Sequence, residues 1–323
     1  PYPPSPNVVA AIEAVLHNQA DALRLYPDPD ALQLQHAIAD QQHLDVSQVF
    51  VGNGSDEVLA HIFKAFFIQN DAILYPDITY SFYPVYSQFF GVKTKQIPLN
   101  AHFEIDVEDY QQPNGGIIIT NPNAPTSIAL SLDKIEQVLK NNPDRVVVID
   151  EAYVDFGAES AVSLIQRYDN LVVCQTTSKS RSLAGLRVGF ALAQAHLIAA
   201  LEAVKNSFNS YPIDRFALAA AVASFQDQSY FEAQCEKVIQ SREVLVTQLE
   251  TLGFKVLPSK ANFIFVTHPA HDAATLATQL REQGIIVRYF NKPRINQFLR
   301  ITIGTDAQNQ RLIDSLSRLF HSA

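Results

Sequence analysis

Short apolar runs rich in β-branched residues recur along the first half of the chain and alternate with helical patterns. They occupy residues 72–76, 92–99, 116–120, 145–150 and 170–175. Several are apolar throughout rather than at every second position, which is typical of strands buried on both faces of a parallel sheet. This repetition predicts an α/β fold in which helices sandwich a mainly parallel sheet.

The pattern changes after about residue 220. Earlier, a helix is predicted over 131–142, with Ser131 as its N-cap and apolar residues at helical spacing. Later, a long helical pattern over 230–253 stops at Gly253, and short strand-like runs follow it. We therefore expect a large domain at 22–222 and a smaller α+β domain formed by 1–21 and 223–323.

Composition narrows the classes of protein that the chain can belong to. The net charge of −9 over 323 residues argues against a nucleic-acid-binding protein, which usually has a basic face. No apolar stretch approaches the roughly 18 residues that a membrane-spanning helix needs. The two cysteines, Cys174 and Cys235, form neither a metal-binding spacing nor a disulfide framework. We expect no metal site, no membrane partner and a cytoplasmic location.

Two polar residues follow neighbouring predicted strands, where open α/β sheets bind ligands. Asp150 ends the run at 145–150, and Lys179 follows the run at 170–175 within QTTSKSRSLAGLRVGF. Asp150 can hold a proton on a heterocyclic nitrogen, although a helix N-cap or a surface turn would also explain it. Lys179 can form a Schiff base, although an exposed loop lysine is the commoner explanation. One strand–helix–strand step separates them, so both side chains can meet at one edge.

An anion site is predicted beside them. The turn FVGNGSDE opens an amphipathic helix, whose first N–H groups attract anions, although Asp56 and Glu57 would also cap a helix without a ligand. The turn matches neither GxGxxG nor a P-loop, so it carries no nucleotide signature. Thr176 and Ser178 can donate hydrogen bonds to a phosphate.

Four further side chains are candidates for contacts with a planar cofactor or an anionic substrate. Tyr80, in the aromatic stretch 77–90, can stack on a ring, and Asn123 can present its amide to a ring substituent. Arg288 and Arg300 lie within apolar strand patterns. One such arginine often makes a structural ion pair, whereas two near a pocket favour bidentate binding of a carboxylate or phosphate.

Taken together, these stretches resemble the fold-type I pyridoxal-phosphate-dependent aminotransferases, and most closely the histidinol-phosphate aminotransferases among them. The matching segments run in the family's order from the first residues to about residue 305. They are PYPPSP, RLYPDPD, VGNGSDE, PDITYSFYPVY, NPNAPT, DEAYVDF, TTSKSRSLAGLRVGF, NSFNSYPIDR and LRITIGT. The combination is specific, whereas no single string would suffice.

The resemblance implies a role for each matching residue. Lys179 would carry pyridoxal 5'-phosphate as a Schiff base and shuttle the substrate proton, and Asp150 would pair with the protonated ring nitrogen. The other roles concern the ring and its phosphate. Tyr80 would stack on the ring, Tyr153 and Asn123 would bond its phenolic oxygen, and Ser55, Asp56, Ser178 and Arg187 would hold its phosphate.

The resemblance also implies a homodimer with a shared active site, in which Tyr26 reaches the partner's cofactor phosphate. Tyr2, Arg288 and Arg300 would face the anionic groups of the substrates. The sequence departs from the family where Ala124 replaces the asparagine that usually contacts the ring, so Asn123 is the expected substitute.

The implied reaction is transamination between L-histidinol phosphate and 2-oxoglutarate in histidine biosynthesis, which yields imidazole-acetol phosphate and glutamate. Three alternatives stay open. An aromatic amino-acid aminotransferase or a decarboxylase of phosphorylated amino acids would need the same cofactor site. A non-catalytic binding protein on the same fold would not need a Schiff-base lysine.

Overall fold

A seven-stranded sheet forms the centre of the large domain in the computed structural model, which describes residues 1–18, 20–68 and 71–321. Its strand order is β1-β7-β6-β5-β4-β2-β3. The strands are β1 (Val49–Gly52), β2 (Ile73–Pro76), β3 (Thr94–Ile97), β4 (Ile117–Thr120), β5 (Val147–Asp150), β6 (Leu171–Thr176) and β7 (Gly189–Ala193). Strands β2 to β6 pair in parallel, as expected, whereas β7 pairs antiparallel with both β6 and β1. The sheet is therefore mainly parallel.

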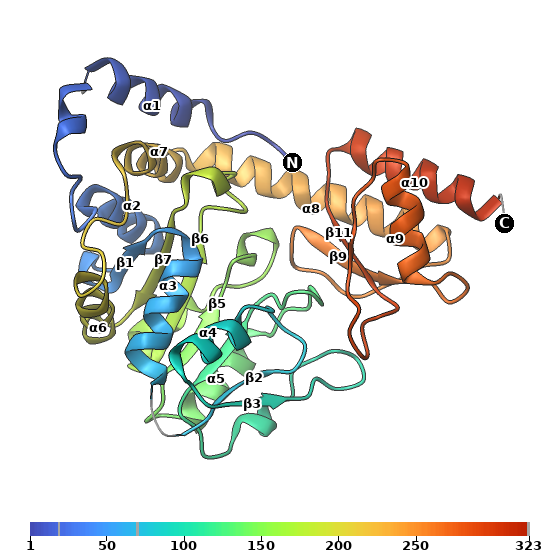
Figure 1. Ribbon diagram of the computed structural model, residues 1–323, viewed down its shortest axis with the longest axis horizontal. Helices are drawn as coiled ribbons and strands as arrows, with labels where there is room; N and C mark the ends of the chain where they lie inside the picture. Colours follow the sequence, from blue (N-terminus) through green and yellow to red (C-terminus); the bar gives the residue numbers. More distant parts are fainter. Residues whose placement is uncertain (19, 69–70, 322–323) are drawn as a thin grey trace.

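Helices cover both faces of this sheet (Figure 1). One face packs against α2 (Leu32–Gln42), α5 (Leu132–Asn141) and α7 (Arg215–Gln226). The other packs against α3 (Gly54–Ile62), α4 (Tyr83–Phe90) and α6 (Ala195–Asn206). Val148 and Ile149 are adjacent in β5 and belong to opposite faces, and both are fully buried. Burial on both faces explains why the strands read as continuous apolar runs. Ser131 precedes α5 as predicted, but its side chain makes no capping hydrogen bond.

The small domain has its own antiparallel sheet and core. Its elements are α8 (Gln228–Thr251), β8 (Lys255–Val256), β9 (Phe263–Thr267), α9 (Ala273–Glu282), β10 (Arg288–Tyr289), β11 (Leu299–Thr302) and α10 (Asp306–His321). The sheet order is β10-β11-β9-β8. Gly253 follows α8 with a φ of 92°, a conformation that glycine adopts without steric cost. The expected α/β fold with a smaller α+β domain is confirmed.

The N-terminal segment contacts elements of both expected domains. Helix α1 (Pro6–Asn18) lies along α7 of the large domain, where Val8 packs with Leu183 and Ala220 (Figure 1). This apolar contact joins α1 to the large domain, whereas the residues before it lie against α8, where the Tyr230 hydroxyl donates to the Pro3 carbonyl oxygen. The expected boundary between residues 222 and 223 falls inside α7, and α8 runs from there into the small domain.

Short helical turns connect these elements. They are η1 (Ala20–Arg24), η2 (Val46–Gln48), η3 (Phe63–Phe67), η4 (Val107–Tyr110), η5 (Val154–Phe156), η6 (Ala161–Arg167) and η7 (Ala184–Leu186). Across the described residues, none of the helices combines the length and the apolarity that crossing a bilayer requires.

Candidate active site

A cavity of about 200 Å³ lies at the carboxyl ends of the central strands. The register of the sheet forms the bottom of this cavity, because it places Thr120 of β4 beside Asp150 of β5. The lining residues come from the strand ends, the start of α3 and the loop between β6 and β7. They are Ser55, Asp56, Leu59, Tyr80, Thr120, Ala124, Asp150, Ala152, Tyr153, Ser178, Lys179, Ala184 and Arg187. The structure thus brings together most of the residues that the sequence predicts for a cofactor site.

Asp150 is the buried acid of this cavity, with 3% of its surface exposed. Its Oδ2 accepts a hydrogen bond of 2.8 Å from the Tyr83 hydroxyl, whereas its Oδ1 has no hydrogen-bond partner among the described residues. Burial raises the pKa of Asp150 to about 6, opposed by the Tyr83 hydroxyl, by the nearby Ala152 backbone and by the charge of Lys179. A buried acceptor without a donor is costly unless a ligand supplies one.

Two residues that support Asp150 were not predicted. Tyr83, at the start of α4, is fully buried, and its hydroxyl also lies 2.7 Å from Thr120 Oγ1. Since that hydroxyl has one proton, it donates to the carboxylate and accepts from Thr120. The aromatic spacing from Tyr80 to Tyr83 and the equal strand-end positions of Thr120 and Asp150 were the available signals.

Lys179 is exposed at the rim of the cavity, and its Nζ lies 5.5 Å from the centre of the Tyr153 ring. The loop that carries Lys179 is tied to the loop after β5, because the Ser180 hydroxyl donates to Asp155 Oδ2 at 2.5 Å. The side chain of Arg181 turns away from the cavity. It is buried, and its Nη1 donates to the Ser224 carbonyl oxygen.

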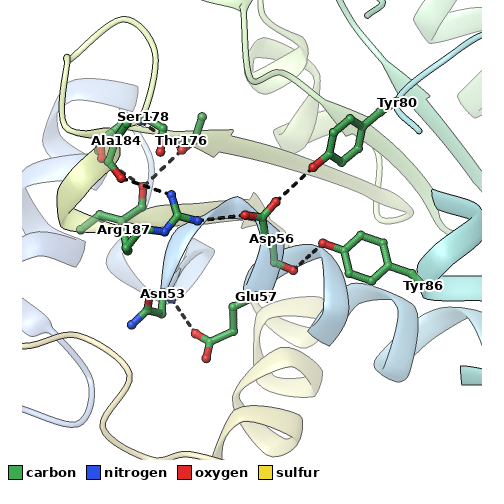
Figure 2. A network of polar contacts seen from close by, with 11 residues as sticks. Asn53, Asp56, Glu57, Tyr80, Tyr86, Thr176, Ser178, Ala184 and Arg187 are labelled. Atoms are coloured by element: carbon green, nitrogen blue, oxygen red, sulfur yellow. Dashed lines mark hydrogen bonds and ion pairs between the residues drawn. The ribbon is translucent and has the colours of Figure 1, made fainter. Parts of the chain in front are cut away.

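The start of α3 forms the anion-attracting end of the cavity (Figure 2). Arg187 Nη2 lies 2.9 Å from Asp56 Oδ2, and the Tyr80 hydroxyl donates to Asp56 Oδ1 at 3.2 Å. Burial, followed by the charge of Asp56, raises the pKa of Tyr80, so the phenol stays protonated. Gly189 allows β7 to approach the start of α3 closely, since a Cβ at this position would lie 2.2 Å from the Ser55 backbone nitrogen.

Three predicted cofactor residues do not line this cavity. Thr176 accepts from the Ser178 backbone N–H, so it shapes the loop (Figure 2). The Asn123 amide donates to the Ile78 carbonyl and to Thr126, and it accepts from Thr79.

These internal bonds occupy the Asn123 side chain, and Ala124 lines the cavity in its place.

Tyr26 is the third predicted cofactor residue outside this cavity. It is 77% exposed and stacks on Tyr211, with ring centres 4.7 Å apart.

The predicted substrate arginines lie behind Tyr153. Arg288 and Arg300 are paired across β10 and β11, and Arg300 lies over the Phe263 ring, which contacts the Tyr153 ring at 4.9 Å. Arg300 Nε is buried and has no hydrogen-bond partner among the described residues. Burial lowers the pKa of Arg300, Tyr153 opposes this, and the charge of Arg288 adds to it. An arginine this short of acceptors is suited to binding an anion.

Tyr2 is placed elsewhere. It lines a separate hollow between α8 and α10, where Lys237 Nζ lies 5.6 Å from its ring centre. The described chain also gathers no group of three or more His, Cys, Asp or Glu side chains that could hold a metal.

Comparisons with known proteins agree with this geometry. The sequence pattern of the family described as aminotransferase class I and II matches residues 1–316. The chain belongs to that family. It is 84% identical to a histidinol-phosphate aminotransferase from Acinetobacter baylyi, over 98% of this chain and 88% of the relative.

Solved structures show the same fold. The histidinol-phosphate aminotransferase from Clostridium acetobutylicum matches with a TM-score of 0.90 at 23% identity, over 99% of this chain and 98% of that one. The Sinorhizobium meliloti enzyme, in complex with pyridoxal-5'-phosphate, matches with a TM-score of 0.88 at 23% identity, over 99% and 88%. The expectation of a pyridoxal-phosphate-dependent aminotransferase is confirmed.

The residues of the cavity fit this cofactor. Asp150 offers a buried acceptor without a donor, suited to a protonated ring nitrogen. Ser55, at the start of α3, and Arg187 suit a phosphate, and Lys179 is an amine suited to an aldehyde.

Proposed function

We propose that this chain exchanges an amino group between L-histidinol phosphate and 2-oxoglutarate in the cytoplasm, as a step of histidine biosynthesis. The observation that carries the proposal is one cavity lined by Lys179, Asp150 and Arg187, in a chain 84% identical to a relative named histidinol-phosphate aminotransferase. The products would be imidazole-acetol phosphate and glutamate.

The proposed cofactor contacts follow the lining of the cavity. Asp150 would receive the ring N–H, Tyr80 would cover the ring, and Tyr153 would donate to the phenolic oxygen. Ser55, through its backbone N–H, and Arg187 would hold the phosphate together with Ser178. When bound, pyridoxal phosphate supplies an electron sink that stabilises negative charge on the substrate carbon.

In the proposed mechanism, Lys179 moves the proton. Its Nζ would take the proton from the amino-bearing carbon of the donor and pass it to the former aldehyde carbon of the cofactor within the same half-reaction, and the second half-reaction would run this transfer in reverse on the acceptor. Asp150, as a carboxylate, would hold the proton on the ring nitrogen of the bound cofactor throughout. Tyr83 keeps the Asp150 carboxylate oriented through its hydrogen bond to Oδ2.

The proposed substrate contacts are Arg288 and Arg300. Their guanidinium groups would alternately receive the phosphate of histidinol phosphate and a carboxylate of glutamate. The unpartnered Nε of Arg300 supports this assignment. Tyr2 would join them only if the N-terminal segment moved from its place beside Lys237.

We also propose a homodimer in which Tyr26 reaches the cofactor phosphate of the partner. Tyr26 and Phe208 are 77% and 81% exposed, and the apolar residues Leu23 and Leu25 are exposed beside Tyr26. An apolar surface of this kind favours burial against a second copy. Mixing inactive Tyr26→Ala and Lys179→Ala proteins should restore activity, because a hybrid dimer would contain one intact site.

A half-reaction with a panel of amino donors tests the proposed substrate. The holoenzyme is mixed with L-histidinol phosphate, L-glutamate, L-phenylalanine or O-phospho-L-threonine, and the cofactor spectrum is followed. Conversion to the amine form by histidinol phosphate and glutamate supports the proposal. Preference for phenylalanine favours the aromatic aminotransferase, and release of CO₂ from phosphothreonine favours the decarboxylase. No spectral change with any donor favours a binding protein.

A further inference from the structure

One arginine joins the small domain to the large one. Arg294 lies in the loop between β10 and β11, and its Nη1 is 2.9 Å from Asp77 Oδ2. Its Nη2 donates to the carbonyl oxygens of Leu99 and Asn100, both at 2.8 Å. A guanidinium can serve three such acceptors at once because its donors are fixed in one plane, whereas a lysine amine cannot match that geometry.

The large-domain residues that bind Arg294 are themselves held together by a hydrogen bond. Asp77 directly follows β2, and its other oxygen accepts from the Leu99 backbone N–H at 2.9 Å. The Phe103 ring lies 5.5 Å from the guanidinium carbon of Arg294. Arg294 and Phe103 have φ values of 68° and 61°, a conformation that costs energy in residues with a side chain. The contacts between the two loops compensate for that cost.

Aromatic packing continues from this contact into the small domain. The Phe103 ring meets the edge of Phe298 at 5.2 Å, and Phe298 stacks on Phe265 at 4.7 Å. Phe265 contacts Phe290 at 6.0 Å. Ile295, at the tip of the same hairpin, is buried in the large-domain core cluster.

The substrate arginines lie on the last ring of this series. The guanidinium carbons of Arg288 and Arg300 are 5.5 and 5.9 Å from the centre of the Phe290 ring. Both residues belong to the hairpin whose tip carries Arg294, and β10 pairs with β11 over only the short register from Arg288 to Tyr289. So short a strand gives the arginines little restraint of its own.

We propose that Arg294 is a positioning residue that holds Arg288 and Arg300 in place for an anionic substrate by docking the β10–β11 hairpin on Asp77 and residues 99–103. The proposal rests on the proposed function, because it takes the two arginines as the substrate's anion site. Docking lowers the entropy that the hairpin would otherwise lose on binding, so anion affinity depends on a residue that does not touch the anion.

Steady-state kinetics of Arg294→Ala is the first test. We expect KM for L-histidinol phosphate to rise about tenfold while kcat stays within about twofold, because docking affects binding rather than proton transfer. Arg167→Ala is the matched control, since Arg167 also makes one exposed ion pair, with Glu136, but far from the hairpin in sequence. Arg294→Lys should recover only part of the affinity.

Two measurements do not depend on the substrate being correct. Calorimetric binding of inorganic phosphate to the holoenzyme should weaken about tenfold in Arg294→Ala, with Arg300→Ala as the reference for loss of the anion site. Hydrogen exchange of residues 290–298 should accelerate in Arg294→Ala and not in Arg167→Ala. If the wild type does not convert histidinol phosphate, the proposed function fails, and phosphate binding still decides this proposal.

A double-mutant cycle completes the test. Asp77→Asn keeps the acceptor for Leu99 but loses the ion pair, so it should weaken phosphate binding, and the double variant should be no worse than Arg294→Ala alone. Unchanged KM and phosphate affinity in Arg294→Ala would overturn the proposal, even if its thermal stability fell, because the contact would then be a structural tether only. A fall in kcat with unchanged KM would overturn it too.

Discussion

The two faces of the sheet at the end of β5 each bury a carboxylate, and they do so differently. Glu151 is 1% exposed, and it accepts hydrogen bonds from the Ala161 backbone N–H at 2.6 Å, the Ser160 hydroxyl at 2.6 Å and the Gln175 amide at 2.8 Å. Among the described residues, Asp150 has one hydroxyl donor, to Oδ2, and its Oδ1 has no hydrogen-bond partner. Burial raises the pKa of Glu151 to about 7 and that of Asp150 to about 6.

The difference separates an acid whose hydrogen bonds lie within the fold from one whose unpaired oxygen fits the proposed contact with the cofactor. Three donors from two segments meet at Glu151, so this residue fastens the start of η6 and the end of β6 to the loop after β5. Asp150 leaves an acceptor unused inside a cavity that also contains Lys179. Leaving a buried acceptor unpaired costs roughly 1–3 kcal/mol, which a protein tolerates where a bound group completes the bond.

The largest expected effect is on the cavity side. Lys179→Ala should reduce turnover by roughly 10⁴-fold or more, because Lys179 carries the only primary amine among the described residues that line the cavity. The visible absorbance of lysine-bound cofactor should disappear, as a spectrum of the purified protein would show. Lys140→Ala, at an exposed lysine of α5, is the control. Persisting turnover would refute the role of Lys179.

Asp150→Asn should come next. We expect a fall in kcat of roughly 10³-fold, because an amide cannot hold the ring nitrogen protonated. The cofactor-free protein should lose no stability, since the change removes a desolvated carboxyl whose pKa burial has raised. Stopped-flow kinetics and denaturant unfolding measure the two quantities. Near-normal rates would place Asp150 with Glu151 as a structural acid.

Glu151→Gln should lower the stability of the protein and leave kcat nearly unchanged, the opposite of what we expect for Asp150→Asn. The amide presents N–H groups to the surrounding donors, so the free energy of unfolding should fall by roughly 1–3 kcal/mol. We expect kcat to stay within about twofold, because Glu151 does not line the cavity. A large loss of kcat in folded protein would erase the distinction between the two acids.

The same variant gives a pH test. An acid whose pKa is raised in the folded state binds protons more tightly there, so its contribution to stability is complete below about pH 4 and is lost as pH rises through the folded-state pKa. For Glu151 that pKa is about 7. The stability of the cofactor-free wild type, relative to Glu151→Gln, should therefore decline from about pH 4 to pH 7. A difference independent of pH would contradict the raised pKa.

Among the variants on the cavity side, Tyr83→Phe should have the smallest effect. Removing the hydroxyl that donates to Asp150 takes away an interaction that lowers the pKa of this acid, so the pKa should rise further. We expect kcat/KM to fall about three- to tenfold, with its acidic limb moved to higher pH. An unchanged pH profile would mean that Tyr83 only fills space.

Much of the site could be predicted because parallel strands carry their ligands at one end. That rule placed Asp150 and Lys179 at one edge without any tertiary information. The rule also applies to Thr120, at the end of the run 116–120, but it does not show the role of Thr120, which depends on strand register. It does not reach Tyr83, whose role depends on the side of α4 that meets the sheet. The amino-acid composition of a strand also does not show its direction in the sheet. The composition of β7 is similar to that of its neighbours, although β7 runs antiparallel to β6.

Turn geometry was the other limit. Successive residues of the turn at 121–127 point to different sides, and a sequence does not show which of them meets the cavity. Asn123 has the polar side chain, but its amide is used within the turn, and Ala124 lines the cavity. The placement of α1 on α7 likewise depends on Val8 meeting Leu183 and Ala220, which are distant in sequence.

Because β7 runs antiparallel to β6, the hairpin that joins the two strands would set the spacing of the proposed cofactor contacts. Lys179 and Arg187 lie in the same connection, between the paired ends of β6 and β7, where Thr176 is opposite Gly189. In the proposed site, the distance between the residue for the aldehyde, Lys179, and the residue for the phosphate, Arg187, would thus be set by a single stretch of chain. Lengthening residues 180–186 would separate the two anchors even if every contacting side chain were kept.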